Sequence, residues 1–416
     1  MSEKNLVGSL IVGQSGGPSS VINCSAYGVI KTGLENPNIT KVYGAFHGIK
    51  GVLNDQLMIM DEEDPAELAN MMHTPSSALG SCRYKIADPD VDDTDYKRIL
   101  EIFKKYNVRY FFYNGGNDSM DTCNKISKYM QSAGYECRIA GIPKTIDNDL
   151  AITDHCPGYG SAAKYIATTI MEVHLDATVY DKGQITIIEI MGRNAGWLAA
   201  AASLASIKGL GPDLVYLPEA PFSMDKFLTQ IETIYKEKNN VIVAVSEGIK
   251  DANGTYISEY SSDLASNTDA FGHKQMGGLA ATLANIVKTR TGAKVRGIEL
   301  SLLQRCGSHL ASATDINEAQ LAGEETLHRA VKGESDFMLG FKRIGDEPYE
   351  IELISIPLSE VANFEKKVPL EWIKPDGLGM SEEFYAYALP LINGETAQPK
   401  EDGLPRFAHI KKVFVK

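Results

Sequence analysis

Short apolar segments recur along the chain, and each ends in a turn rich in glycine or polar residues. The segments are rich in Val, Ile, Phe and Tyr, and their apolar residues mostly run on continuously instead of alternating with polar ones. Such runs are typical of strands that are buried on both faces of a parallel sheet. We therefore predict strands at residues 6–12, 108–113, 138–142, 184–190 and 240–245.

Helical patterns lie between these strands. Within residues 94–107 the apolar side chains are spaced as i, i+3, i+4, i+7 and i+10, which places them on one helix face. Further helices are predicted at residues 119–133, 161–174 and 269–289. The alternation of strand and helix predicts an α/β protein whose sheets are covered by helices on both sides. The least regular stretch begins at about residue 393, and we expect it to wrap the surface.

Length and composition indicate a folded protein of two or three domains. The chain has 416 residues, of which 44% are hydrophobic and 23% are charged. This balance supplies enough apolar material for a core. No stretch approaches the roughly 18 uninterrupted apolar residues of a transmembrane helix, and the N-terminus does not resemble a signal peptide. We therefore expect a cytoplasmic protein with no membrane partner.

Charge and cysteine content narrow the possible partners further. The chain has 41 Lys and Arg residues against 54 Asp and Glu, a formal net charge of −13. Nucleic-acid binding requires a positive surface, so we expect no nucleic-acid partner. The eight histidines show no zinc-binding spacing such as HExxH. No CxxC pair is present, and we expect buried, reduced thiols at Cys24, Cys82, Cys123, Cys137, Cys156 and Cys306.

Five turns that follow predicted strands carry the residues that are best suited to binding or catalysis. Their sequences are GQSGG (13–17), NGGNDS (114–119), PKTIDND (143–149), MGR (191–193) and SEG (246–248). Each one alone is most simply a turn or a helix cap. In an open parallel sheet, however, ligands bind beyond the carboxyl ends of the strands. Five such turns at one end of a sheet therefore predict a binding site.

The two glycine-rich turns, GQSGG and NGGNDS, are suited to phosphate. Each joins a strand to a helix start through small residues, so that backbone N–H groups can approach an anion and the helix dipole attracts it. Two such loops indicate an extended phosphate chain or two phosphate groups. Ser15 and Ser119 offer hydroxyl donors, and both are equally suitable as N-caps.

Two carboxylates and several arginines suit the chemistry of phosphoryl transfer. In TIDND, Asp147 and Asp149 flank an amide, so that one carboxylate can accept a proton while the other orients it or contacts metal or substrate. Arginine forks match phosphate geometry, although surface salt bridges are an equally good explanation for any single arginine. The arginines near glycine-containing turns or strand ends are Arg83, Arg193, Arg296 and Arg305.

Together these motifs resemble the phosphofructokinase family and, within it, the pyrophosphate-dependent branch. The resemblance runs from about residue 6 to about residue 361, and the order and spacing of PKTIDND and MGR are its most specific part. It implies two doubly wound, mostly parallel-sheet α/β domains with the active site in the cleft between them. Residues 1–157 plus 304–355 would bind the phosphoryl donor, residues 158–303 plus 356–392 the sugar phosphate, and 393–416 would form a C-terminal tail.

The resemblance implies transfer of a phosphoryl group onto the 1-hydroxyl of fructose 6-phosphate. Asp147 matches the catalytic base, Thr145 and Asp149 match its polar neighbours, and Arg193 contacts the transferring group. The residues that match sugar-phosphate contacts are Asp149, Met191, Gly192, Glu247, Arg296 and Arg305. The family assembles as dimers or tetramers, so a homodimer or homotetramer is implied.

Two positions indicate pyrophosphate as the donor. Members of the family that use ATP usually have GGDGS, and a glycine before TIDND; this chain has Asp118 and Lys144 there. The Asp118 carboxylate would crowd and repel a nucleotide α-phosphate, whereas the Lys144 ammonium can bind pyrophosphate. The residues that match donor contacts are Gly13, Gly16, Arg83, Gly116, Asp118, Ser119 and Lys144. The implied cofactor is Mg²⁺, held by Asn117, Asp118 and pyrophosphate oxygens.

Three positions depart from the family pattern, and two other functions stay open. Asn117 replaces a common metal-binding aspartate, Gln184 an arginine that often reaches a neighbouring subunit's 6-phosphate site, and Leu302 a histidine near the sugar. One alternative is an ATP-dependent sugar-phosphate kinase of the same fold. The other is a catalytically silent regulatory subunit that binds sugar phosphate, and the presence of Asp147 argues against it.

Overall fold

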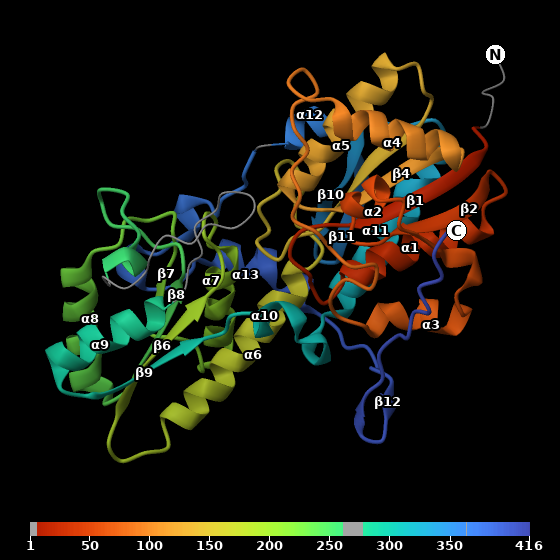
Figure 1. Ribbon diagram of the computed structural model, residues 1–416. Coiled ribbons are helices and arrows are strands. Elements are labelled where there is room, and N and C mark those ends of the chain that lie inside the picture. The colour runs from red at the N-terminus through yellow and green to blue at the C-terminus, as the bar shows by residue number, and fades with distance from the viewer. Residues whose placement is uncertain (1–5, 261–277, 363) are drawn as a thin grey trace.

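The computed structural model describes residues 6–260, 278–362 and 364–416, which form two α/β units (Figure 1). The larger unit contains a seven-stranded sheet in the order β11-β10-β5-β4-β1-β2-β3. The strands β10, β5, β4, β1 and β2 are parallel to their neighbours in that series, whereas β3 and β11 pair antiparallel at the two edges. The strands are β1 (Gly8–Gln14), β2 (Ile39–Ala45), β3 (Leu57–Ile59), β4 (Val108–Gly115), β5 (Arg138–Pro143), β10 (Phe337–Asp346) and β11 (Tyr349–Pro357).

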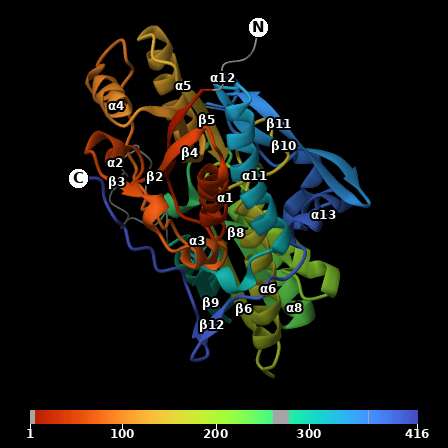
Figure 2. The same cartoon turned by 90° about the vertical axis from the view of Figure 1, so that its right-hand side faces the viewer.

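Helices cover both faces of this large sheet, as the continuous apolar strands require. One face packs against α2 (Ile49–Leu53), α4 (Thr94–Lys105), α5 (Asn117–Ser132) and α12 (Leu358–Val361). The other face packs against α1 (Ile22–Glu35), α3 (Pro65–Asn70) and α11 (Ala313–Val331). Helices α1 and α11 lie side by side (Figure 2). Gly28 and Gly323 permit this approach, because a Cβ on either would collide with the backbone of the other helix.

The smaller unit is built on a four-stranded, fully parallel sheet in the order β7-β8-β6-β9. Its strands are β6 (Gln184–Ile190), β7 (Leu214–Tyr216), β8 (Val241–Ser246) and β9 (Lys294–Glu299). Its two faces pack against α6 (Tyr159–Ala177), α7 (Trp197–Ala201) and α13 (Glu382–Ala388) on one side and α8 (Met224–Lys238) and α9 (Leu279–Thr291) on the other. The short helix α10 (Leu303–Cys306) leads the chain back toward α11.

The predicted class, two doubly wound and mostly parallel α/β units, is confirmed. All five predicted strands are present as β1, β4, β5, β6 and β8, and the predicted helices correspond to α4, α5, α6 and α9. The first part of the predicted helix at 269–289, up to residue 277, lies outside the described residues. No helix of the described ranges is long and apolar enough to cross a membrane.

The C-terminal tail runs along the surface of the large unit. Beyond residue 393 the chain forms the small hairpin β12 (Lys400–Glu401) and β13 (Leu404–Pro405), then runs over the large unit, where Val415 pairs with Leu57 of β3. The expected surface course is therefore confirmed.

All six thiols are free, but the prediction that all are buried is wrong: Cys306 is exposed because α10 lies at the surface, and Cys82 and Cys137 are half-buried.

Candidate active site

A cleft of about 650 Å³ receives all five turns that the sequence singled out. Turns that follow β1, β4 and β5 of the large sheet meet turns that follow β6 and β8 of the small sheet. The strands are parallel, so their carboxyl ends converge on this one space. The predicted site residues that line it are Gly16, Arg83, Gly116, Asn117, Asp118, Ser119, Lys144, Thr145, Asp147, Asp149, Met191, Arg193, Glu247 and Arg305.

Three predicted residues do not line the cleft. Gly13 lies inside β1, where a Cβ would stand 3.0 Å from the ring of Tyr113, so its smallness serves strand packing. Gly192 stands between Met191 and Arg193, which do line the cleft, and has a φ of 126°, a conformation that residues with a side chain rarely adopt. Arg296 lies on the edge strand β9, away from this cleft.

The Lys144 side chain, from the turn after β5, reaches the backbone of the first glycine-rich turn. Gly16 has a φ of 77°, and the Lys144 ammonium donates a hydrogen bond to the Gly17 carbonyl at 2.7 Å. The Arg305 guanidinium also lies against Gly17, where a Cβ would stand 2.7 Å from its Nη1 atom. The turn therefore leaves room for two cations beside its backbone, which suits a polyanionic ligand.

Helix α5 points its N-terminus into the cleft from the second glycine-rich turn. The helix begins at Asn117, so the first backbone N–H groups of its opening turn lack intrahelical acceptors and favour an anion. Asp118 lies exposed in this first turn. The Asn117 Oδ1 atom is buried and has no hydrogen-bond partner among the described residues. It is an oxygen donor available to a cation.

Lys144 is a buried cation with an altered affinity for its proton. Only 5% of the residue is exposed, and this burial lowers its pKa to about 8, although Asp147 opposes the shift. The positive charges of Arg305 and Arg83 lower its pKa further. At neutral pH Lys144 is still protonated, so Lys144, Arg83 and Arg305 present three cations close together in the cleft.

Asp147 and Asp149 face the cleft as a pair of carboxylates. Burial raises the pKa of Asp147, while the nearby cations Lys144 and Arg193 counteract the rise. Burial together with the Asp147 charge raises the pKa of Asp149 to about 7. The Asp147 N–H donates to Thr145 Oγ1 at 3.1 Å, which fixes the turn locally. A carboxylate with a raised pKa beside cations can accept a proton from a hydroxyl group.

The wall on the side of the small sheet is held by Glu247 and its neighbours. Burial raises the pKa of Glu247 to about 7, and the Asp147 charge adds to the rise. The Gly192 N–H donates to Glu247 Oε1 at 3.3 Å. The Arg193 Nε atom is buried and lacks a hydrogen-bond partner within the described ranges. This wall therefore offers a carboxylate acceptor and a guanidinium donor to the same ligand.

Three further polar residues line the cleft that the sequence analysis did not identify. Lys85 stands two residues after Arg83, and this i, i+2 spacing was the available signal. Asn194 follows the MGR motif and donates to Glu365 Oε1 at 2.8 Å. Glu365 comes from the segment after α12, and nothing in its local sequence indicated that it reaches the cleft.

The sequence matches the Phosphofructokinase family model over residues 9–298. The chain belongs to the phosphofructokinase family. A Halomonas elongata protein named pyrophosphate–fructose 6-phosphate 1-phosphotransferase is 42% identical over 96% of this chain and 95% of its own length. One of the same name from Xanthomonas campestris is 43% identical over 98% and 97%. The crystal structure of a pyrophosphate-dependent phosphofructokinase from Marinobacter aquaeolei superposes with a TM-score of 0.88 at 37% identity, covering 99% of this chain and 98% of that one.

Two of the positions that depart from the family pattern lie away from the cleft. Gln184 is buried at the start of β6 and lines, with Arg296, a second hollow of about 240 Å³. Leu302 is 54% exposed just before α10. Arg305 lines the cleft and Arg296 lines the second hollow, so these two arginines, both predicted to contact the sugar phosphate, do not share a pocket within one chain.

Proposed function

We propose that this phosphofructokinase transfers a phosphoryl group reversibly from pyrophosphate to the 1-hydroxyl of fructose 6-phosphate. The products are fructose 1,6-bisphosphate and phosphate, and the reaction is a step of glycolysis. The observation that carries the proposal is the joint presence of Lys144 and Asp118 in a cleft with Asp147. The names of its relatives over their full length support the same donor and acceptor.

Asp147 acts as the base in this proposal. Its carboxylate accepts the proton of the 1-hydroxyl as that oxygen forms its bond to phosphorus, and the bond to the departing phosphate breaks. Thr145 holds the turn through the Asp147 N–H, and repulsion between the neighbouring Asp147 and Asp149 carboxylates raises the affinity of the pair for a proton. The Lys144 and Arg193 cations lower the energy of the negative charge that develops on the transferring group.

Pyrophosphate lies on the side of the large sheet, between the two glycine-rich turns. The backbone near Gly16 and Gly116 and the Ser119 hydroxyl donate to its oxygens, and Arg83 adds charge. Asn117 and Asp118 are suited to hold Mg²⁺, because an unpaired amide oxygen and an adjacent carboxylate are the hard oxygen ligands it prefers. Bound Mg²⁺ supplies neutralisation of the charge on the pyrophosphate oxygens.

Fructose 6-phosphate lies on the side of the small sheet. Glu247 accepts hydrogen bonds from sugar hydroxyls, Met191 lines the wall beside it, and Arg305 binds the 6-phosphate. Gly192 contributes indirectly, because its N–H donates to Glu247 Oε1. Arg296 lies outside the cleft of its own chain, so it can serve a 6-phosphate only in a second copy. We therefore propose a homodimer or homotetramer, located in the cytoplasm.

Activity with the two candidate donors tests this proposal directly. The assay measures fructose 1,6-bisphosphate formation from fructose 6-phosphate with pyrophosphate or with ATP, each with Mg²⁺. We expect turnover with pyrophosphate and little or none with ATP, because the Asp118 carboxylate in the cleft would repel a nucleotide α-phosphate. Faster turnover with ATP would make the chain an ATP-dependent kinase. Binding of fructose 6-phosphate without turnover from either donor would make it a regulatory subunit.

The Arg305→Ala variant tests the assignment of the two substrates to the two sides of the cleft. A charge-assisted bond contributes about 1.5–3 kcal/mol, so we expect the KM for fructose 6-phosphate to rise about 10- to 100-fold with the KM for pyrophosphate little changed. The control is Arg290→Ala, which removes a surface arginine paired with Glu232 at 2.9 Å. A rise confined to the KM for pyrophosphate would instead assign Arg305, which lies against Gly17, to the donor.

A further inference from the structure

Asn148, between the two cleft carboxylates, points in the opposite direction to them. Asp147 and Asp149 line the cleft, whereas Asn148 is fully buried and has a φ of 55°, a left-handed conformation that asparagine tolerates. Both ends of its amide are engaged. The Nδ2 atom donates to the Tyr387 hydroxyl at 2.7 Å, and the Oδ1 atom accepts from the Cys156 N–H at 2.9 Å.

Tyr387 reaches this position from α13, far along the chain. Its hydroxyl accepts from Asn148 and donates to the Asp154 carbonyl at 2.8 Å, so both its acceptor and its donor capacity are used. Its ring lies 5.2 Å from the ring of Trp197 and 5.5 Å from that of Trp372, measured between centroids. Burial raises the pKa of Tyr387 well above its ordinary value, so the hydroxyl keeps its proton at any working pH.

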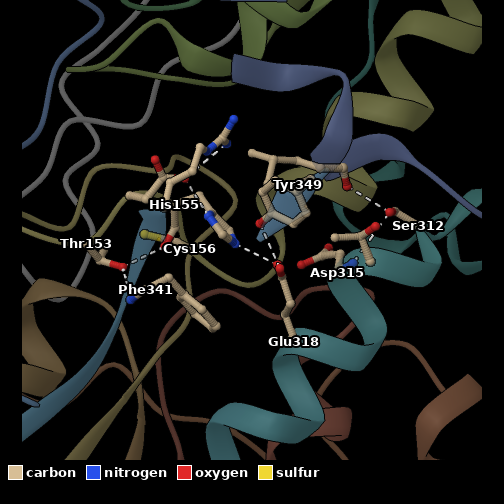
Figure 3. A network of polar contacts seen from close by, with 12 residues as sticks. Thr153, His155, Cys156, Ser312, Asp315, Glu318, Phe341 and Tyr349 are labelled. Atoms are coloured by element: carbon tan, nitrogen blue, oxygen red, sulfur yellow. Dashed lines mark hydrogen bonds and ion pairs between the residues drawn. The ribbon is translucent and has the colours of Figure 1, made fainter. Parts of the chain in front are cut away.

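A buried polar network fixes Tyr387 and the chain around Asp154 in turn. Arg343 of β10 donates to the Tyr387 carbonyl at 2.9 Å and to Asp154 Oδ2 at 3.1 Å. His155 bridges Asp154, at 2.8 Å, and Glu318 of α11, at 2.7 Å. Figure 3 shows the His155 ring directed toward Glu318, with the Tyr349 hydroxyl meeting the same carboxylate. Each charged side chain of this buried network is paired with an opposite charge, although the Arg343 Nε atom has no hydrogen-bond partner among the described residues.

The next residues after the catalytic turn are held by Lys366 as well. Its backbone N–H donates to the Asp149 carbonyl at 2.7 Å, and its ammonium donates to the carbonyls of Thr153 and Asp154 at 3.1 and 2.6 Å. Its own carbonyl accepts from the Trp197 Nε1 atom at 3.0 Å. The segment after the carboxylates is thus fixed at several points. Between Asp147 and Asp149 the turn is fixed by the side-chain hydrogen bonds of Asn148.

We propose that Tyr387 is a positioning residue for Asp147, acting through the amide of Asn148. The proposal rests on the assignment of Asp147 as the base. Without the hydroxyl, the Asn148 Nδ2 donor is left unpaired in the interior, which costs free energy. Rotation of the turn that brings Nδ2 to another acceptor relieves this cost. Rotation there moves the neighbouring Asp147 carboxylate relative to the 1-hydroxyl. Catalysis is sensitive to such movement, since a displacement of about 1 Å can cost about 10²-fold in rate.

The Tyr387→Phe variant keeps the ring and removes only the hydroxyl. We expect kcat to fall about tenfold, while the KM values for pyrophosphate and fructose 6-phosphate stay within about twofold of wild type. The matched control is Tyr159→Phe, which removes another buried hydroxyl, hydrogen-bonded to the Trp197 carbonyl at 3.3 Å, from a ring 6.5 Å from that of Tyr387. We expect both variants to lose some thermal stability and only Tyr387→Phe to lose kcat.

A second set of variants keeps the inference falsifiable. If Tyr387 acts through Asn148, the double variant Asn148→Ala, Tyr387→Phe should lose no more kcat than Asn148→Ala alone. Additive losses would overturn the inference. It would be overturned equally by a Tyr387→Phe kcat within about twofold of wild type, or by equal kcat losses in Tyr387→Phe and Tyr159→Phe. A wild-type protein inactive with both donors would instead refute the proposed function on which the inference rests.

Discussion

Replacing Asp147 with asparagine should lower kcat by about 10²–10⁴-fold, the contribution that a positioned general base makes. The amide keeps the shape of the side chain but cannot accept the proton of the 1-hydroxyl. The Asp147 N–H bond to Thr145 belongs to the backbone and survives the change, so the turn should keep its geometry. We therefore expect the KM values for both substrates to stay within about twofold of wild type, measured by steady-state kinetics with pyrophosphate.

The pH profile gives this prediction a second readout. A base works only when it is deprotonated, and burial raises the pKa of Asp147 above its ordinary value. Wild-type turnover should therefore fall as the pH drops through that raised pKa, and the residual turnover of Asp147→Asn should lack this fall. The control is Asp121→Asn, since Asp121 pairs with Lys125 at 2.7 Å on α5 and does not line the cleft. A large rise in KM with unchanged kcat would make Asp147 a binding residue instead.

The strands that the sequence predicted are those whose burial produces a continuous run of apolar residues. Strands β1, β4, β5, β6 and β8 are buried on both faces, so each is a continuous apolar run. Strand β9 lies at an edge and carries Lys294, Arg296 and Glu299 toward solvent, which hides it from the same test. Strands β10 and β11 pair antiparallel at one end of the large sheet, and both contain exposed residues that interrupt their apolar runs.

The site residues likewise divide into those that the sequence could predict and those that it could not. The turns were predictable because each one follows its strand within a few residues, and parallel strands bring those turns together. Glu365 and Tyr387 were not, because their contacts with Asn194 and Asn148 join segments far apart in sequence. The network behind Tyr387 draws on α11, β10, β11 and α13, and none of these carries a motif that announces its partners.

The choice of donor should depend on Lys144 for charge and on Asp118 for space. Lys144→Gly should lower kcat/KM with pyrophosphate by about 10²–10³-fold, the cost of removing one preorganised charge-stabilising group from a transferring centre. Asp118→Gly should lower pyrophosphate activity less and raise ATP activity about fivefold. Asp118 is exposed, so water screens its repulsion of an α-phosphate to about 1 kcal/mol at 4 Å. The measurement is kcat/KM with each donor for wild type, both single variants and the double variant.

Lys144→Met separates charge from space, because methionine keeps the volume of the lysine stem. We expect it to lose as much pyrophosphate activity as Lys144→Gly and to admit no ATP. The pKa of Lys144 is about 8, so wild-type turnover with pyrophosphate should decline as the pH rises through that value and the cation is lost, a decline that Lys144→Met should not show. The thermal melting temperature of Asp118→Gly must be measured as a control for lost stability, since the change removes an acidic residue from the first turn of α5. If Lys144→Gly, Asp118→Gly stays as selective for pyrophosphate as wild type, these residues mark the pyrophosphate-dependent branch without causing its selectivity.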